Sequence, residues 1–255
     1  MTAPVVRMLL AQTGAELRTR WRIPAFSLTS LLLPIVFYAF FALPVAHLTR
    51  PDGVSVGAFL VASFGAYAVG SVMVNGFGIG VATERAMKLD VLIRVTPLPP
   101  AVYLLAKVIT ALVFGLGCVV ALTAFATIVG GVRQPLDVWV AAAGLLLAGS
   151  LPFIGLGFAI GYAVGPQSAP AVANLVYLPL SFASGLFVPL EQLPSLVRGL
   201  APYLPTYHYG RLAWHAVGAG TGALWESVGW LGGYTVAFLA IALRAYRRDE
   251  RLKFS

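Results

Sequence analysis

Residues 138–190 read VWVAAAGLLLAGSLPFIGLGFAIGYAVGPQSAPAVANLVYLPLSFASGLFVPL, a run of 53 residues without Asp, Glu, Lys or Arg. A bilayer core about 30 Å thick takes roughly 20 apolar residues in one helix, so the run is long enough for two crossings. The segment GPQSAP at 165–170 predicts the turn between them, because its prolines and glycine break a helix and its polar residues suit an interface. The run therefore predicts a helical hairpin in lipid.

The rest of the chain has the same apolar character. Hydrophobic residues make up 59% of the chain and charged residues 10%, whereas soluble domains average about 25% charged residues. The apolar runs are continuous and do not alternate with period two, which favours helices over a β-barrel. The first run is too long for a signal peptide and no clear cleavage site follows it, so we expect it in the mature protein. We predict an all-α integral membrane protein, one domain over residues 1–255, with six transmembrane helices at 24–46, 56–82, 108–130, 138–164, 171–189 and 227–243.

The basic residues predict the orientation, because short cytoplasmic segments are enriched in Lys and Arg. Thirteen of the 17 basic residues fall in the N-terminal segment, in the loop after the second run and in the C-terminal tail: Arg7, Arg18, Arg20, Arg22, Arg85, Lys88, Arg94, Lys107, Arg244, Arg247, Arg248, Arg251 and Lys253. The other side holds Arg50, Arg133, Arg198 and Arg211. Both termini are therefore predicted to be cytoplasmic, in a cell (inner) membrane. The net charge of +8 then reflects topology and attraction to anionic membrane lipid, and we expect no nucleic-acid partner.

Several self-sufficient mechanisms lack their required residues. No acidic or basic residue lies clearly within a predicted span, which argues against coupling to an ion gradient. The sequence has no GxxxxGK[ST] phosphate loop for nucleotide hydrolysis. His208 and His215 have no third ligand nearby in the sequence, so we expect no metal site. If the protein moves a substrate uphill, another protein must supply the energy.

The predicted cytoplasmic loop at 82–107 reads ATERAMKLDVLIRVTPLPPAVYLLAK. Its first half is predicted to form a short amphipathic helix, with Met87, Val91 and Val95 at four-residue spacing, and the following prolines end it. A solvated turn is the simpler alternative. The loop resembles that of ABC-2 type transporter permeases in Glu84, Arg85, Thr96, Pro97, Tyr103 and Lys107, while Ala86 and Lys88 replace an acid and a glycine that are common in the family.

Residues 184–214 read SGLFVPLEQLPSLVRGLAPYLPTYHYGRLAW and carry too many prolines for an uninterrupted spanning helix. Two short helices dipping into the outer leaflet, or an ordinary long loop with interfacial aromatic residues, fit this composition. The stretch also resembles ABC-2 permeases, in Gly185, Phe187, Pro189, Leu193, Pro194, Leu204, Pro205 and His208. The family implies a re-entrant cap between spans five and six over the outer end of the pathway.

The resemblance covers nearly the whole chain and implies the permease subunit of an ABC exporter. A largely apolar route suits a lipid-like or drug-like molecule, but ion, polysaccharide and peptide exporters use related permeases. Such a subunit forms the pathway as a dimer with an identical or different second permease, and a separate ATPase subunit uses ATP and Mg. We therefore expect no catalytic residue and no cofactor bound by this chain. The ATPase contacts are predicted at Glu84, Arg85, Lys88, Asp90, Arg94, Thr96 and Pro97, and the pathway lining at Asn75, Phe77, Asn174, Tyr177 and Phe182. Residues 4–22 are predicted to form an amphipathic interfacial helix that also touches the ATPase.

Two other classes of protein remain open. A rhomboid-like intramembrane protease also has six helices and a Gly-x-Ser-Gly setting, which Ser184 and Gly185 superficially resemble. Phe182 stands where the first glycine of that motif belongs, and the histidines lie in a proline-rich loop. A non-catalytic membrane scaffold or assembly factor is the other alternative.

Overall fold

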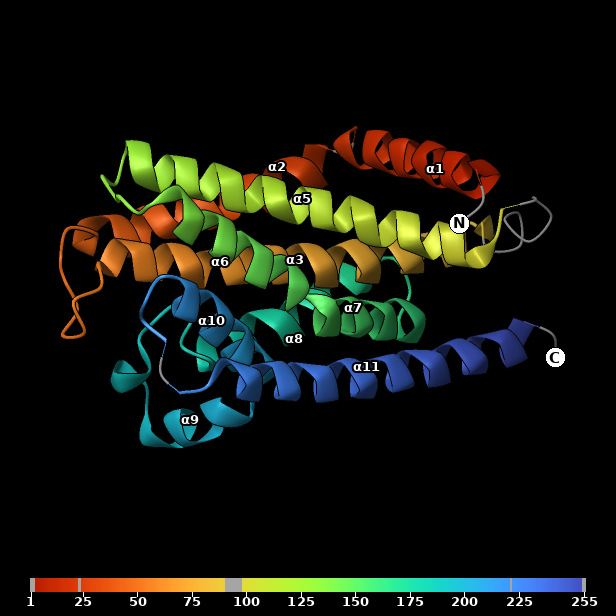
Figure 1. Ribbon diagram of the computed structural model, residues 1–255. Coiled ribbons are helices and arrows are strands. Elements are labelled where there is room, and N and C mark those ends of the chain that lie inside the picture. The colour runs from red at the N-terminus through yellow and green to blue at the C-terminus, as the bar shows by residue number, and fades with distance from the viewer. Residues whose placement is uncertain (1–2, 23, 90–97, 221, 254–255) are drawn as a thin grey trace.

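The computed structural model describes residues 3–22, 24–89, 98–220 and 222–253, which form helices joined by short loops (Figure 1). The long and medium helices are α1 (Ala3–Trp21), α2 (Pro24–Phe37), α3 (Val56–Ala86), α5 (Pro100–Ile128), α6 (Leu136–Ala148), α7 (Leu151–Ala163), α8 (Ala169–Ala183), α10 (Pro205–Ala216) and α11 (Leu224–Lys253). The short elements are η1 (Tyr38–Ala42), η2 (Leu43–Val45), η3 (Leu190–Gln192), α9 (Ser195–Leu200) and η4 (Ala201–Tyr203).

Four helical stretches are long and apolar enough to cross a membrane: Val56–Ala86, Pro100–Ile128, Leu136–Ala163 and Leu224–Asp249. Two shorter apolar helices cover Ser30–Val45 and Ala169–Ala183. The prediction of an all-helical fold is therefore confirmed for the described residues, and four of its helical stretches have the length and composition of membrane spans. Six crossings and a re-entrant segment stay predictions, because length alone does not place the shorter helices in the bilayer.

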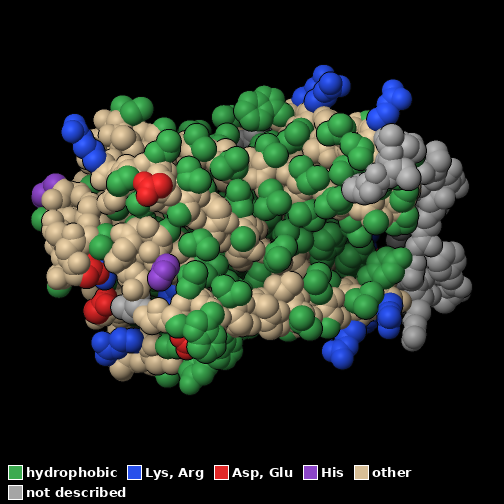
Figure 2. Space-filling model, viewed as in Figure 1, with side chains coloured by type: hydrophobic (Ala, Val, Ile, Leu, Met, Phe, Trp, Pro, Cys, Tyr) green, Lys and Arg blue, Asp and Glu red, His purple; other side chains and the backbone are tan. Residues whose placement is uncertain are grey.

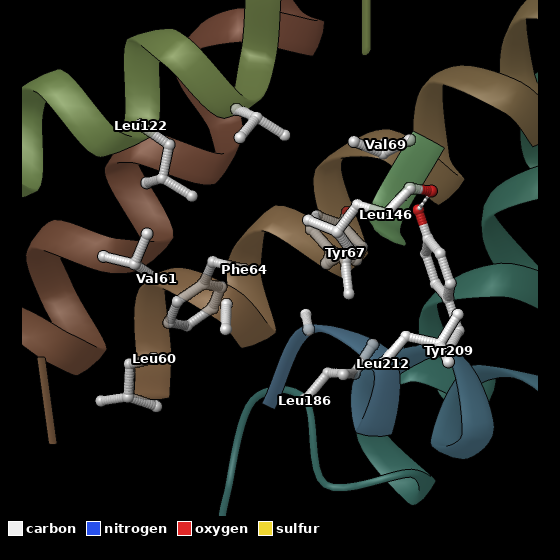
Figure 3. Packing of buried hydrophobic residues seen from close by; sticks show 14 of the residues in the cluster. Leu60, Val61, Phe64, Tyr67, Val69, Leu122, Leu146, Leu186, Tyr209 and Leu212 are labelled. Atoms are coloured by element: carbon white, nitrogen blue, oxygen red, sulfur yellow. Dashed lines mark hydrogen bonds between the residues drawn. The ribbon is translucent and has the colours of Figure 1, made fainter. Parts of the chain in front are cut away.

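Helix α3 is the centre of the molecule. Every residue from 57 to 70 is buried, although α3 is apolar enough to face lipid. Its Phe64 and Tyr67 lie in one apolar cluster with side chains from α5, α6 and α10 (Figure 3). Two tyrosine hydroxyls are satisfied inside this cluster: Tyr209 donates to the carbonyl of Leu146 at 2.7 Å (Figure 3), and Tyr177 donates to the carbonyl of Ala66 at 3.2 Å. These bonds fix α10 and α8 in place where water does not reach.

Helices α3 and α7 approach closely because glycines lie between them. A Cβ atom added to Gly157 would come within 2.8 Å of Phe77 Cβ and 2.9 Å of the Val74 carbonyl oxygen. One at Gly161 would meet Val81 Cβ at 2.8 Å. Gly157 and Gly161 have the four-residue spacing of small residues that lets membrane helices pack backbone to backbone.

Replacing Gly157 with alanine should therefore destabilise the protein by about 1–3 kcal/mol, because α7 must move away from the backbone of α3. Gly144 on α6 is the matched control, since a Cβ atom there meets nothing within 4 Å. The Gly144→Ala variant should be as stable as the parent or slightly more stable, because alanine favours a helix. Thermal unfolding in one detergent measures the stability of both variants. Equal stability would show that the α3–α7 contact accommodates a methyl group at position 157.

Three predicted spans differ in detail from the structure. The helix predicted at 171–189 ends at Ala183, because Gly185 turns the chain with a φ of 81°. The span at 138–164 is divided into α6 and α7 at Gly149 and Ser150. Pro152 lies at the start of α7, where a proline is tolerated, and a Cβ atom at Gly149 would meet Leu212 Cδ1 of α10 at 2.5 Å, so α10 packs closely against the break. The span at 24–46 passes from α2 through the wider turn of η1 into the tighter turn of η2, which contains Pro44.

The two ends of the molecule differ. Figure 1 shows the start of α1, the end of α3, the start of α5 and the end of α11 at one end, which we call the terminal end. Helices α9 and α10 lie at the opposite end (Figure 1). In the face that Figure 2 shows, charged side chains gather toward both ends and hydrophobic side chains cover the middle. This distribution suits a protein whose middle lies in hydrocarbon.

Candidate functional site

A cluster of charged side chains joins three helices at the terminal end. Lys107 of α5 donates a hydrogen bond to Glu16 of α1 at 2.9 Å and another to Glu84 near the end of α3. The Tyr103 hydroxyl also donates to Glu84. The Lys107 side chain is only 2% exposed, so it depends on these carboxylates for the interactions that water would otherwise provide. We call Glu16, Arg20, Glu84, Tyr103 and Lys107 the charged cluster.

Arg20 completes the charge balance of this cluster. Its Nε lies 4.0 Å from Glu16 Oε2, and its Nη2 donates to the carbonyl of Gly76 in α3 at 3.1 Å. Burial lowers the pKa of the Arg20 guanidinium, and the carboxylates of Glu16 and Glu84 act in the opposite direction. Two acidic and two basic side chains thus face one another where α1 meets α3 and α5.

Arg85, the next residue after Glu84, connects a different set of helices. Its Nη1 donates to the carbonyl oxygens of Gly161 at 2.7 Å and Val164 at 3.3 Å, at the C-terminal end of α7. It also forms an ion pair with Asp249 near the end of α11, and its Cζ lies 5.6 Å from the centre of the Tyr162 ring. A guanidinium at this place satisfies the last carbonyls of a helix and favours the negative end of its dipole.

The predicted ATPase contacts occupy different environments. Glu84 and Arg85 are largely engaged inside the protein, through the charged cluster and through α7 and α11. Lys88 is exposed just after α3, with a backbone φ of 54° that ends the helix. Asp90, Arg94, Thr96 and Pro97, with the second half of the predicted amphipathic helix, lie outside the described residues. The contact with an ATPase stays a prediction for all seven.

A cavity of about 630 Å³ opens between α1, α2, α3 and α8. Glu16, Arg20 and Glu84 of the charged cluster line it toward the terminal end, and Leu33, Pro34 and Tyr67 line its apolar part. Asn75 and Asn174, almost 100 positions apart, both line this cavity. The Asn75 amide donates to the Ser71 carbonyl and to the Ser71 hydroxyl, each at 3.2 Å, so its orientation is fixed. The cavity therefore has charged side chains at one end, and apolar side chains with a few serines and asparagines line the rest.

The three aromatic residues predicted to line a pathway lie elsewhere. Phe77 is 1% exposed and its ring packs on Phe158 of α7. Tyr177 is also 1% exposed and stacks on Tyr67. Phe182 is 37% exposed and stacks on Phe187 at a centroid distance of 4.1 Å. Whether any of the five residues lines a transport route stays a prediction.

The residues of the predicted outer cap lie opposite the terminal end. Gly185 has a φ of 81°, and a Cβ atom there would meet Leu190 at 2.8 Å, so the turn requires glycine. Phe187 is buried against rings of α2, α3 and α8. Pro189 precedes η3, Pro194 precedes α9 and Pro205 starts α10. The short, proline-separated helices predicted for this region are present, and their depth in a membrane stays a prediction.

His208 ties this region to α11. Its Nε2 donates to the carbonyl of Pro202 at 2.8 Å, which leaves Nδ1 to accept from the Ser227 hydroxyl at 3.4 Å. The ring also stacks on Trp230 at a centroid distance of 5.1 Å. Burial lowers the pKa of His208, and the bond to Pro202 acts in the opposite direction. The histidine thus packs this region against α11, and no cluster of potential metal ligands is found among the described residues.

Sequence reasoning missed how the charged cluster assembles. It recorded Glu84, Tyr103 and Lys107 as separate matches to a pattern, whereas the three side chains bond to one another. The four-residue spacing of Tyr103 and Lys107 places them on one face of a helix and was the available signal. Their bonds to Glu84 and to Glu16 depend on packing between helices, which spacing does not show.

Two comparisons with known proteins complete this description. Residues 8–214 match the family described as ABC-2 type transporter. The chain is also 29% identical over 245 residues to a protein of Bacillus subtilis (strain 168) named "Putative transport permease YvfS". That match covers 96% of this chain and 99% of the Bacillus protein, so the two are similar from end to end.

Proposed function

Because the chain belongs to the ABC-2 type transporter family, we propose that it is the membrane-spanning permease subunit of an exporter driven by a separate ATPase. The observation that carries this proposal is the cavity of about 630 Å³ among otherwise apolar helices, with the charged cluster at its terminal end. A site that is apolar over most of its wall and charged at one end suits an amphipathic molecule, drug-like or lipid-like. This chain binds no nucleotide in the proposal, and ATP and Mg belong to the partner.

The proposed topology has six crossings. The four long stretches supply four of them. Helix α2 with η1 and η2 covers residues 24–45, about 33 Å at 1.5 Å per residue, and supports a fifth. Helix α8 (Ala169–Ala183) is shorter, about 22 Å at 1.5 Å per residue, and is proposed as the sixth crossing. The excess of basic residues at the terminal end favours the cytoplasmic side of the cell membrane for both termini.

The ATPase is proposed to dock at the connection between α3 and α5. Glu84 near the end of α3 links the two ends of that connection, because it accepts hydrogen bonds from Tyr103 and Lys107 of α5. Arg85 couples the same point to α7 and α11. These two residues therefore support the docking surface, and Lys88 with Asp90, Arg94, Thr96 and Pro97 provides the contacts. Helix α1 reaches the same end and is proposed to lie at the cytoplasmic interface.

A second permease is proposed to close the cavity. Leu32 of α2 and Leu175 of α8 are exposed and are next in sequence to residues that line the cavity. Phe40 of η1 is also exposed. Two such surfaces facing each other would place Asn75 and Asn174 of both copies around one route. The short helices from η3 to α10 are proposed as the outer cap of that route. The side chains of Phe187 and His208, which are buried, hold this region against the rest of the protein.

The test is co-expression of the permease with its cognate ATPase. The purified permease alone should hydrolyse no ATP, whereas the complex should contain two permeases and two ATPases by native mass spectrometry and should hydrolyse ATP. Deleting the permease gene and screening for lost tolerance identifies the compound for reconstitution. Uphill movement of that compound by the permease alone, driven by a proton gradient, would reject the proposal.

A further inference from the structure

A groove lies between the end of α1, α2 and α5, and it is separate from the cavity described above. Its volume is about 650 Å³, and its walls are the end of α1, Leu31 of α2 and residues 113–121 of α5. Apart from its mouth the groove is apolar, and the small side chains at Gly117 and Ala121 leave space along α5. No residue of the charged cluster lines it. The two cavities are thus separate in position and in chemistry.

The mouth of this groove is basic. Arg18 and Arg22 of the α1 segment are four residues apart, line the groove and are exposed. Neither forms an ion pair with an acidic side chain in the part of the chain that the structure describes. Trp21 lies between them in sequence, is 67% exposed and has its ring 6.1 Å from that of Phe114. Arginine beside an exposed tryptophan is the composition found where lipid headgroups meet the hydrocarbon core.

The α5 wall of the groove is nearly as long as half of the bilayer core is thick. Residues 113–121 of α5 rise about 12 Å along the helix axis, and half of a bilayer core is about 15 Å. A molecule that places an anion against Arg18 and Arg22 can therefore lay a hydrocarbon chain along this wall. Long arginine side chains reach from the groove toward the headgroup level while their stems stay against apolar surface.

We infer that this groove binds one anionic glycerophospholipid, with its phosphate against Arg18 and Arg22 and an acyl chain beside Gly117. Charge complementarity selects this occupant: an apolar segment of another protein would leave both guanidinium groups unpaired beside the hydrocarbon core, whereas a phosphodiester pairs with both. The site is a separate one from the transport route, so it does not depend on the proposed transport activity.

The experiment uses the full chain in phosphatidylcholine vesicles that contain a minor fraction of phosphatidylglycerol with a photoactivatable acyl chain. Crosslinks should concentrate on residues 113–121. The Arg18→Gln/Arg22→Gln variant should lose roughly fivefold of this labelling for each arginine, because each basic residue contributes about a factor of five to binding an anionic lipid. The Arg244→Gln/Arg247→Gln variant removes two exposed charges from α11 and should label like the parent.

A second pair of variants tests the apolar part of the groove. A Cβ atom at Gly117 meets nothing within 4 Å, so Gly117→Leu should fold and fill the space of the acyl chain. Gly144→Leu on α6 is the control, because its Cβ atom also meets nothing within 4 Å. Gly117→Leu should abolish labelling of residues 113–121 and Gly144→Leu should not.

Three results would overturn the inference. One is equal labelling of α5 and α6, which would mean that only bulk lipid contacts the groove. Another is equal labelling by a phosphatidylcholine probe, which would mean that the arginines select no headgroup. The third is equal loss in the α11 double variant, which would mean that general surface charge attracts the lipid. Unchanged thermal unfolding of each variant verifies that labelling changes do not come from misfolding.

Discussion

Replacing Lys107 with methionine should lower the thermal unfolding temperature of the purified permease by about 10 °C. The lysine is 2% exposed, and its removal leaves Glu16 and Glu84 facing each other without their common partner. Removing one member of a buried ion pair typically costs about 3–5 kcal/mol. For a chain of this size about 2–4 °C of unfolding temperature corresponds to each kcal/mol.

Two further variants separate the charged cluster from a general effect of losing a lysine. Lys88→Met makes the same substitution at an exposed position and should shift the unfolding temperature by no more than a few degrees. Glu84→Gln combined with Lys107→Met should recover part of the loss, because the remaining Glu16 still has Arg20 at 4.0 Å. If Lys107→Met has the same unfolding temperature as the parent, the charged cluster does not hold α1 to α3 and α5.

The fold was predictable where lipid alone decides it. Long uncharged runs such as 138–190 predict helices because backbone groups in hydrocarbon have no other partners. The break between α6 and α7 was not predicted, although Gly149 and Pro152 are visible in the sequence. At the break Gly149 lies against Leu212 of α10, a residue more than 60 positions away, and this contact is not visible in the sequence.

The candidate site shows the same limit. Asn75 and Asn174 were singled out because an amide at membrane depth must face protein or a pathway, and both line one cavity. Phe77 is predicted to line the pathway, and the structure places its ring against Phe158 of α7. Arg85 was predicted as an ATPase contact from its place in a motif alone. Its bonds to α7 and α11 require knowing which helix ends meet, which one sequence does not contain.

Reversing the charge of Arg85 should reduce the amount of ATPase recovered with the permease by about tenfold, which corresponds to about 1.4 kcal/mol. A glutamate at this position repels Asp249 and leaves the carbonyl oxygens of Gly161 and Val164 without their donor. The end of α3, from which the proposed docking surface continues, then loses its link to α7 and α11. Membrane insertion should not change, because the substitution lies outside the apolar part of α3. The measurement is co-purification followed by ATP hydrolysis of the complex.

A variant of Asp249 distinguishes two ways in which Arg85 can act on docking. If Arg85 acts by positioning the end of α3, then Arg85→Glu combined with Asp249→Lys should recover most of the ATPase, because the ion pair is rebuilt with its charges exchanged. Arg244→Glu, the same charge change elsewhere on α11, should leave recovery unchanged. A double variant no better than Arg85→Glu alone would mean that Arg85 touches the ATPase directly. If the Arg85→Glu variant recovers as much ATPase as the parent, this end of α3 plays no part in docking. The reason is that reversing the charge of a residue that positions the docking surface should displace that surface.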